Sequence, residues 1–257
     1  MLAPRALNPS ERARLRRALE APADKVLRDV DGVTLRGADL RRVLQDDWLN
    51  DEAINVALGL LRQRVPPARS GRAPRAHVFS SQFFAKLAGP DGLNQTLRWI
   101  GRARVQYNVF ECDLILFPIN VSNTHWVLAA FRNEPDNRRL ELYDSWGGLG
   151  GEGSAVMPAM TLIEAWIRSA AGGSGLFDAA SGRRPHAPKF EVAEAPIAHT
   201  APQCAKQGDG ASCGLFLLAF AEALALGRAL PEDLGAHVQD ARRALALELL
   251  GGGASPP

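Results

Sequence analysis

Residues 214–226 constrain the fold more than any other part of the chain, because they are predicted to form a helix that is apolar on nearly every face. Such a helix is stable only where other elements surround it, so it belongs in the middle of a core. With 257 residues, the chain can form one large domain that buries roughly 70% of its unfolded surface. We therefore expect one core built around this helix.

The rest of the chain alternates between helical and strand-like patterns. The first helix is expected to start with Pro9 and Ser10 ahead of Glu11. Helices are predicted, in chain order, up to about residue 25 and at 54–61, 157–169, 214–226 and 231–250. Strands are predicted at 114–119, 126–131, 140–143 and 190–195. Helices first, strands in the middle and helices last predict an α+β fold.

Composition suggests boundaries within the chain. We expect an N-terminal peripheral helical extension at 1–30, a main domain at 31–250 and a disordered tail at 251–257. A basic loop with proline and glycine occupies 68–75. A second loop, rich in glycine and proline, is expected to be mobile at 171–189.

The charge and hydropathy of the chain exclude several classes of partner. The formal net charge is only +2 at pH 7, and the arginines of the N-terminal part are interpreted as solvated helix faces rather than a basic recognition surface. No stretch approaches the ~18 uninterrupted apolar residues that span a bilayer. We expect a monomer with no cofactor, no nucleic-acid partner and no membrane partner.

The three cysteines are Cys112, Cys204 and Cys213. They lack the paired spacing of a zinc site or a disulfide framework, so no metal site is expected. A reducing, intracellular compartment, cytoplasm or nucleus, is the simpler inference. Cys112 and Cys204 are interpreted as small buried hydrophobes, the commoner role of a lone cysteine.

Cys213 differs because it stands between a polar loop at 207–212 and the start of the buried helix. Backbone amides and the helix dipole stabilise a thiolate at a helix N-terminus, so Cys213 is a candidate nucleophile. Gln207 lies six residues earlier, and its amide could stabilise an oxyanion together with the backbone N–H of Cys213. The alternative for Cys213 is a small buried hydrophobe, and a glutamine alone in a loop indicates nothing.

A histidine and an aspartate are brought together by a predicted hairpin. Its turn falls at 133–137, and a hairpin centred on Glu134 and Pro135 pairs His125 with Asp144. A carboxylate beside an imidazole fixes its tautomer and stabilises the imidazolium, as a general base requires. The alternative is an exposed cross-strand ion pair without a chemical role.

Together these residues resemble the ubiquitin-like-protein-specific cysteine proteases, the Ulp/SENP group of peptidase family C48, which process and remove SUMO and related modifiers. The resemblance extends from about residue 33 to residue 228, and its pieces occur in the order of the family. They are Trp48-Leu49-Asn50-Asp51 with Ile54, Phe83-Phe84, Pro118-Ile119-Asn120, His125-Trp126, Asp144-Ser145, Gln207 with Gly210, and Cys213-Gly214. Each piece is weak, but the ordered set is specific.

The resemblance implies a cysteine-protease fold in which a central, mostly antiparallel sheet is flanked by helices and the nucleophile begins a buried helix. It makes 31–250 the protease domain. It implies that Cys213 is the nucleophile, His125 the base, Asp144 the acid that orients it and Gln207 the oxyanion donor. No cofactor is implied.

The resemblance also implies a substrate site. Trp48 and Trp126 resemble the tryptophans that cover a narrow tunnel for the Gly-Gly tail of a modifier, where only glycines pass without a clash. Asp51 resembles an acidic contact to the modifier. The alternatives are core packing for the two tryptophans and helix capping for Asp51.

Some positions depart from the common family pattern. Ser212 stands where many members have Asp, and Asp209 stands where Asn is frequent. Gln203 follows Pro202 in a way that also resembles the family, but its spacing to the cysteine favours Gln207 as the oxyanion donor.

The expected reaction is cleavage after the Gly-Gly of a ubiquitin-like modifier or its conjugates, with SUMO favoured and ubiquitin or another relative as alternatives. Acidic residues near the tunnel would favour ubiquitin, whose tail is more basic; the candidates are Asp46, Asp47, Asp51 and Glu52. Two other functions are considered: acetyl transfer by a related Cys/His/acid set, and a non-catalytic module that binds a ubiquitin-like protein. The Ala/Arg/Gly-rich composition is compatible with a bacterial effector secreted into a host cell.

Overall fold

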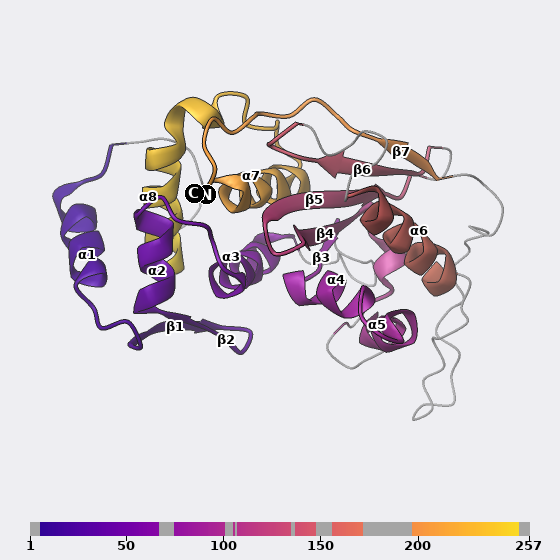
Figure 1. Ribbon diagram of the computed structural model, residues 1–257, viewed down its shortest axis with the longest axis horizontal. Coiled ribbons are helices and arrows are strands. Elements are labelled where there is room, and N and C mark those ends of the chain that lie inside the picture. Colours follow the sequence, from indigo (N-terminus) through magenta and orange to yellow (C-terminus); the bar gives the residue numbers. More distant parts are fainter. Residues whose placement is uncertain are drawn as a thin grey trace. The chain divides into compact units, whose positions relative to one another are not determined.

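A computed structural model of the chain describes residues 6–66, 75–100, 105, 107–134, 137–147, 156–171 and 197–251. The chain groups into two compact units. Unit 1 comprises Met1–Arg64, Asp144–Trp146 and Cys204–Pro257, and unit 2 comprises Val65–Tyr143 and Gly147–Gln203. Figure 1 gives the labels of the helices and strands.

Unit 2 is built on a sheet of five strands in the order β3-β4-β5-β6-β7 (Figure 1). The strands are β3 (Ala76–Val78), β4 (Leu114–Val121), β5 (His125–Arg132), β6 (Arg139–Tyr143) and β7 (Ala198–Thr200). The longer ladders, β4 with β5 and β5 with β6, are antiparallel, whereas the short edge strands β3 and β7 are parallel to their neighbours. The expected α+β fold with a mostly antiparallel central sheet is confirmed.

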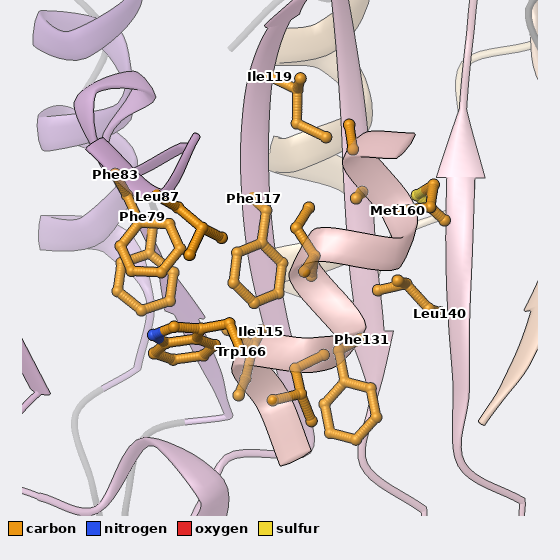
Figure 2. Close-up of a cluster of buried hydrophobic side chains, with 14 of the residues drawn as sticks. Phe79, Phe83, Leu87, Ile115, Phe117, Ile119, Phe131, Leu140, Met160 and Trp166 are labelled. Atoms are coloured by element: carbon orange, nitrogen blue, oxygen red, sulfur yellow. The ribbon is translucent and has the colours of Figure 1, made fainter. Parts of the chain in front are cut away.

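Three helices cover one face of this sheet: α4 (Ser81–Leu87), α5 (Gly92–Ile100) and α6 (Met157–Ala171). Figure 2 shows the hydrophobic cluster between them and the strands. Trp166 of α6 is fully buried there, and its ring centroid lies 5.0 Å from that of Phe83 and 5.8 Å from that of Phe117 in edge-on geometry. A 3-10 turn, η1 (Val109–Glu111), adds Val109 and Phe110 to the cluster.

Side chains on the other face of β6 include a buried carboxylate. Glu141 is 5% exposed, and its oxygens accept hydrogen bonds from Arg132 at 2.9 Å, Arg139 at 2.9 Å and the Tyr143 hydroxyl at 2.7 Å. Burial by itself would raise the pKa of Glu141, but the bonds from Tyr143 and Arg132 outweigh it and lower the pKa. The charged carboxylate is therefore the stable form in the folded protein.

Unit 1 combines helices with one hairpin. Its elements are α1 (Pro9–Leu19), β1 (Val26–Val30), β2 (Val33–Arg36), α2 (Gly37–Leu44), α3 (Asp51–Arg64), α7 (Cys213–Leu226), η2 (Leu234–His237) and α8 (Val238–Leu249). Helices α1, α2 and α8 contact one another, and α3 packs on α7 (Figure 1). Almost every residue of α7 is buried, as its apolar sequence predicts. It ends at Gly227, whose φ of 65° is a left-handed C-cap.

Several element boundaries differ from the expected ones. Asn8, rather than Pro9 or Ser10, caps α1, because its side chain accepts from the Glu11 amide and Glu11 bonds back to the Asn8 amide. The last helix begins at Val238 rather than at residue 231, since the 3-10 turn η2 precedes it. The hairpin at Val26–Arg36 crosses the boundary drawn between residues 30 and 31.

Other expectations fall on parts that are not described. The strand expected at 190–195, nearly all of the loops at 68–75 and 171–189, and the tail from residue 252 lie outside the described residues. Among the described residues, no helix is both long and apolar enough to cross a bilayer.

We expect Glu141→Gln to lower the free energy of unfolding at pH 7 by about 2 kcal/mol or more, because the two partly buried guanidinium groups of Arg132 and Arg139 lose their charged acceptor. Since the folded-state pKa of Glu141 lies below the ordinary 4.5, this stabilisation is present above pH 4.5 and is lost as the pH falls through the lower folded-state value. Urea unfolding of both proteins between pH 3 and pH 7 measures the difference.

The matched control is Glu134→Gln, which removes a half-exposed partner of the same Arg139. It should cost less than about 1 kcal/mol. Equal effects of the two substitutions, or an effect of Glu141→Gln that grows as the pH falls, would contradict the assignment.

Candidate active site

Cys213 is the first residue of α7 and is 2% exposed. The first intrahelical bond runs from Phe216 N to the Ser212 carbonyl at 3.1 Å, so the Cys213 N–H lies outside the helical ladder, as at any helix start. The thiol therefore lies at the positive end of the dipole of a buried helix. This is the position that the sequence predicts for it.

The loop before Cys213 is held by its own aspartate. The Oδ1 atom of Asp209 accepts hydrogen bonds from Ala211 N at 2.7 Å and Ser212 N at 2.8 Å. One carboxylate oxygen thus satisfies two backbone donors in a turn immediately before the helix, whose own N-cap, Ser212, makes no side-chain capping bond. An asparagine oxygen could do the same, which explains why Asp209 can stand where Asn is frequent.

Three successive carbonyls of this loop each receive a donor from a different place in unit 1. Gln207 Nε2 donates to Asp209 O at 2.6 Å, Trp48 Nε1 to Gly210 O at 2.7 Å and Arg242 Nη2 to Ala211 O at 3.1 Å. Backbone without a helix or strand must find such partners. One donor belongs to the loop itself and the other two come from distant segments, so the path of the chain into Cys213 is fixed by contacts both within the loop and outside it.

The amide of Gln207 is oriented by Ser145. Ser145 Oγ donates to Gln207 Oε1 at 2.7 Å, and Gln207 N donates to the Ser145 carbonyl at 3.0 Å. With the oxygen engaged by a hydroxyl, the nitrogen must occupy the other side of the amide, toward the loop that leads to Cys213. An amide nitrogen carries two hydrogens, and Asp209 takes one of them. This geometry suits the role expected of Gln207.

Asp144 is joined to the same loop through its backbone. Its carbonyl accepts from Lys206 Nζ at 2.8 Å, and its Oδ1 accepts from Trp146 N at 2.9 Å. The side chain is 6% exposed. The structure therefore brings Asp144, Ser145, Gln207 and the loop before Cys213 together in unit 1.

Trp48 is 41% exposed, so the alternative of core packing does not describe it. Its indole N–H is held by the Gly210 carbonyl. Next to it, Leu49 packs on Gly214, where an added Cβ would lie 3.0 Å from the Leu49 Cβ. Glycine at residue 214 allows this close approach between the segment of Trp48 and the start of α7.

Asp51 is an exposed residue in the first turn of α3, and it is not the cap of that helix. Asn50 has that role, because its Oδ1 accepts from Ala53 N at 3.2 Å and its carbonyl from Ile54 N at 3.1 Å. The capping alternative for Asp51 is therefore wrong.

His125 and Trp126 belong to unit 2, where they begin β5 and are buried. The turn before them, at 122–124, has positive φ at Ser122 and Asn123. In the ladder of β5 with β6, Arg132 pairs with Arg139 and Leu128 with Tyr143. The expected register is therefore wrong by two residues, because the connection is centred one residue further along the chain. The ladder ends at Tyr143, and the contact of His125 with Asp144 and Cys213 stays a prediction.

Of the other two cysteines, Cys112 is buried as expected, whereas Cys204 is only partly buried, so the expectation of a small buried hydrophobe is wrong for Cys204. Cys112 is 1% exposed, and burial raises the pKa of its thiol to about 12, with the nearby Asp113 and Glu111 acting in the same direction. Burial also raises the pKa of Cys204, against the opposing charge of Lys206. Neither thiol is activated for nucleophilic chemistry.

Sequence reasoning missed three sets of contacts in this site: the bond from Ser145 to Gln207, the bonds of the Asp209 carboxylate to the loop, and the bonds of Arg242. The Asp209 turn had a local signal, since an aspartate two and three residues before the amides it binds is a common turn arrangement. The other two had none, because Ser145 and Arg242 reach the loop from 62 and 30 or 31 residues away along the chain.

We expect Asp209→Ala to lower the free energy of unfolding by about 1 kcal/mol, since two backbone N–H groups lose their acceptor. Asp209→Asn should stay within about 0.5 kcal/mol of the parent, because the amide oxygen accepts as well as the carboxylate does. Urea unfolding at pH 7 compares the two variants. Equal losses in both would mean that the charge of Asp209, and not its oxygen, is what matters.

Comparison with known proteins places these features in a family. Residues 47–251 match the Ulp1 protease family, C-terminal catalytic domain. The ubiquitin-like-specific protease ESD4 of Arabidopsis thaliana is 32% identical over 119 residues, covering 46% of this chain and 24% of that protein. Sentrin-specific protease 2 of Homo sapiens is 31% identical over 129 residues, covering 50% of this chain and 20% of that protein. The matched part is thus about a quarter or less of each relative's length.

Solved structures agree with the fold. The C-terminal Ulp1 protease domain in complex with Smt3, the yeast ortholog of SUMO, has a TM-score of 0.75 at 17% identity, over 98% of both chains. The Ulp1-like SUMO protease catalytic domain of Chaetomium thermophilum has a TM-score of 0.68 at 25% identity, over 100% of this chain and 93% of that one. The family match takes in Trp48, the sheet of unit 2 and the whole of α7 and α8, and the chain belongs to the Ulp1 protease family.

Proposed function

We propose that this chain is a cysteine protease and isopeptidase that cleaves after the C-terminal Gly-Gly of a ubiquitin-like modifier, with SUMO as the favoured modifier. The observation that carries the proposal is the start of α7, where a thiol follows a loop whose three carbonyls are all engaged by side-chain donors. Because the chain belongs to the Ulp1 protease family, we interpret the thiol at this position as the nucleophile of the reaction.

In the proposed reaction, the Cys213 thiolate attacks the carbonyl carbon of the terminal glycine. The oxyanion that forms is stabilised by the backbone N–H of Cys213 and by the Gln207 amide. Protonated His125 gives its proton to the departing lysine amine, and a thioester to Cys213 remains. His125 then takes a proton from water, which attacks the thioester and releases the modifier with a free carboxylate. Asp144 orients the imidazole throughout.

Recognition of the tail is proposed to rest on Trp48 and Trp126, with Asp51 as an acidic contact to the modifier. The exposure of Trp48 supports this, because a large apolar ring is kept at the surface while its N–H is fixed to Gly210. A ring held in this way can cover a flat Gly-Gly segment and exclude longer side chains.

The charges near Trp48 favour SUMO over ubiquitin. Asp47 is paired with Arg42 at 2.8 Å, and Asp46 accepts from Gln239 and lies 3.5 Å from Arg242 Nε. Two of the four acidic side chains that could attract a basic tail thus already have partners within unit 1, which weakens their attraction for such a tail. The names of the relatives point the same way, since they include SUMO and sentrin proteases.

The test uses SUMO and ubiquitin probes that carry an electrophile at the C-terminal glycine, with the adduct measured by intact mass. We expect an adduct with SUMO that forms at least about 10-fold faster than with ubiquitin. It should be absent in Cys213→Ala and unchanged in Cys112→Ala. A folded protein that forms no adduct with any modifier would overturn the protease proposal, and a faster ubiquitin adduct would overturn the modifier preference.

The role of Asp144 is tested separately with Asp144→Asn. The asparagine keeps an Oδ1 acceptor for the Trp146 amide but loses the charge that fixes and stabilises the imidazolium. We expect kcat on a SUMO fusion to fall by at least about 100-fold with little change in KM. A near-normal kcat would show that another residue is the acid.

A further inference from the structure

Arg242 of α8 is a buried cation close to the site and has no role in the proposed chemistry. It is 1% exposed, although arginine is rarely buried to this extent. Burial lowers the pKa of its guanidinium, and the nearby carboxylates of Asp46, Asp209 and Asp47 offset this only in part. Its Nε has no hydrogen bond within the described residues. Burying this cation is therefore costly, and its other hydrogen bonds must offset the cost.

The guanidinium binds two separate segments of unit 1. Nη1 donates to the backbone carbonyls of Arg42 at 3.2 Å, Val43 at 3.2 Å and Asp47 at 3.1 Å. The last of these immediately precedes Trp48. The first segment is therefore the backbone that leads directly into Trp48, whose indole is exposed.

Nη2 binds the second segment, immediately before the nucleophile. It donates to Ala211 O at 3.1 Å and to Ser212 Oγ at 3.3 Å. Because a guanidinium is planar and rigid, the directions of its two Nη groups are fixed relative to each other. The carbonyls of Asp47 and Ala211 are consequently held at a fixed position and direction relative to each other.

Two further contacts join the same segments. The Trp48 indole donates to Gly210 O, and Leu49 packs on Gly214. Arg242 thus binds two segments that also contact each other directly. Its acceptors in both segments include main-chain carbonyls, which substitutions at Trp48 or Cys213 would not remove.

We infer that Arg242 is a positioning residue that fixes the position of the Trp48 indole relative to the oxyanion-binding N–H of Cys213. The inference rests on the proposed function. It adds that Arg242 of α8 orders two parts of the site together: Trp48, which is proposed to cover the Gly-Gly tail, and the loop before Cys213. Arg242 acts through the carbonyls of Asp47 and Ala211 and the hydroxyl of Ser212, and its charge also lies near Cys213 without a hydrogen bond to the thiol.

The test compares Arg242→Lys with Arg243→Lys. Lysine keeps the charge but presents a single ammonium that cannot bind both segments in fixed directions. Arg243 is the next residue, half-exposed, and among the described residues its ion pair is with Asp240 on its own helix at 3.0 Å. On a SUMO fusion we expect kcat/KM to fall about 10- to 100-fold in Arg242→Lys, with kcat lowered and KM raised, and no change in Arg243→Lys.

Alkylation of Cys213 by iodoacetamide separates positioning from general damage, because this small reagent needs neither the tail cover nor the oxyanion donor. Its rate in Arg242→Lys should stay within about 3-fold of the parent, while labelling by the SUMO probe slows at least about 10-fold. Equal losses in both reactions, with a lowered unfolding midpoint, would overturn the inference in favour of a purely structural role. So would unchanged labelling by the probe in a folded variant.

One further measurement tests the inference even if Arg242→Lys does not fold or the parent has no protease activity. Ser212→Ala removes one acceptor of the guanidinium without adding volume. Hydrogen exchange in this variant should speed up in peptides spanning 43–48 and 208–213, but not in β4. Exchange identical to the parent in both peptides would overturn the inference. An inactive parent overturns the proposed function alone, because the exchange result does not depend on turnover.

Discussion

Helix α7 has no side that can face water, and this constraint determines where Cys213 lies. A helix of this kind must be enclosed, and its first residue is then held at a depth and direction that the loop alone could not provide. The same enclosure places the N-terminal end of the helix dipole in surroundings with little water, where electrostatic interactions are stronger. The position of Cys213 thus follows from the burial of the helix that it begins.

The loop before Cys213 shows how irregular backbone is stabilised at such a place. Its amides are bound by Asp209, and its carbonyls by Gln207, Trp48 and Arg242. Each of these side chains satisfies backbone and at the same time fixes a group that the proposed reaction uses. Stability and preorganisation of the oxyanion site therefore have the same physical origin, which is the requirement that buried polar groups be paired.

The two buried charges, Glu141 and Arg242, show how partners decide the state of an ionisable group. Glu141 accepts from three donors, two of them cationic, and these outweigh its burial, so its pKa falls. Arg242 donates mainly to neutral carbonyls, so burial prevails and its pKa falls as well, which for a cation means a less stable charged form. The cost of burying the Glu141 charge is offset by its cationic partners. The cost of burying the Arg242 charge is not offset in this way, and we attribute its presence to the fixed geometry that it gives the two segments it binds.

The sequence by itself determined the elements with strong periodicity: the buried helix at 214–226, the three antiparallel strands β4, β5 and β6, and the cysteine at a helix start. These follow from local patterns, since apolar repeats and turn residues act over a few positions. It also contains the Asp31-Gly32 turn, whose positive φ at both residues closes the hairpin of β1 and β2. Only the tertiary structure decided the β5–β6 register, the cap at Asn50, and the contacts of Ser145 and Arg242 with the loop. Those features depend on residues that are distant in the chain, or on a choice among several adequate local partners, and no pattern of neighbouring residues determines either.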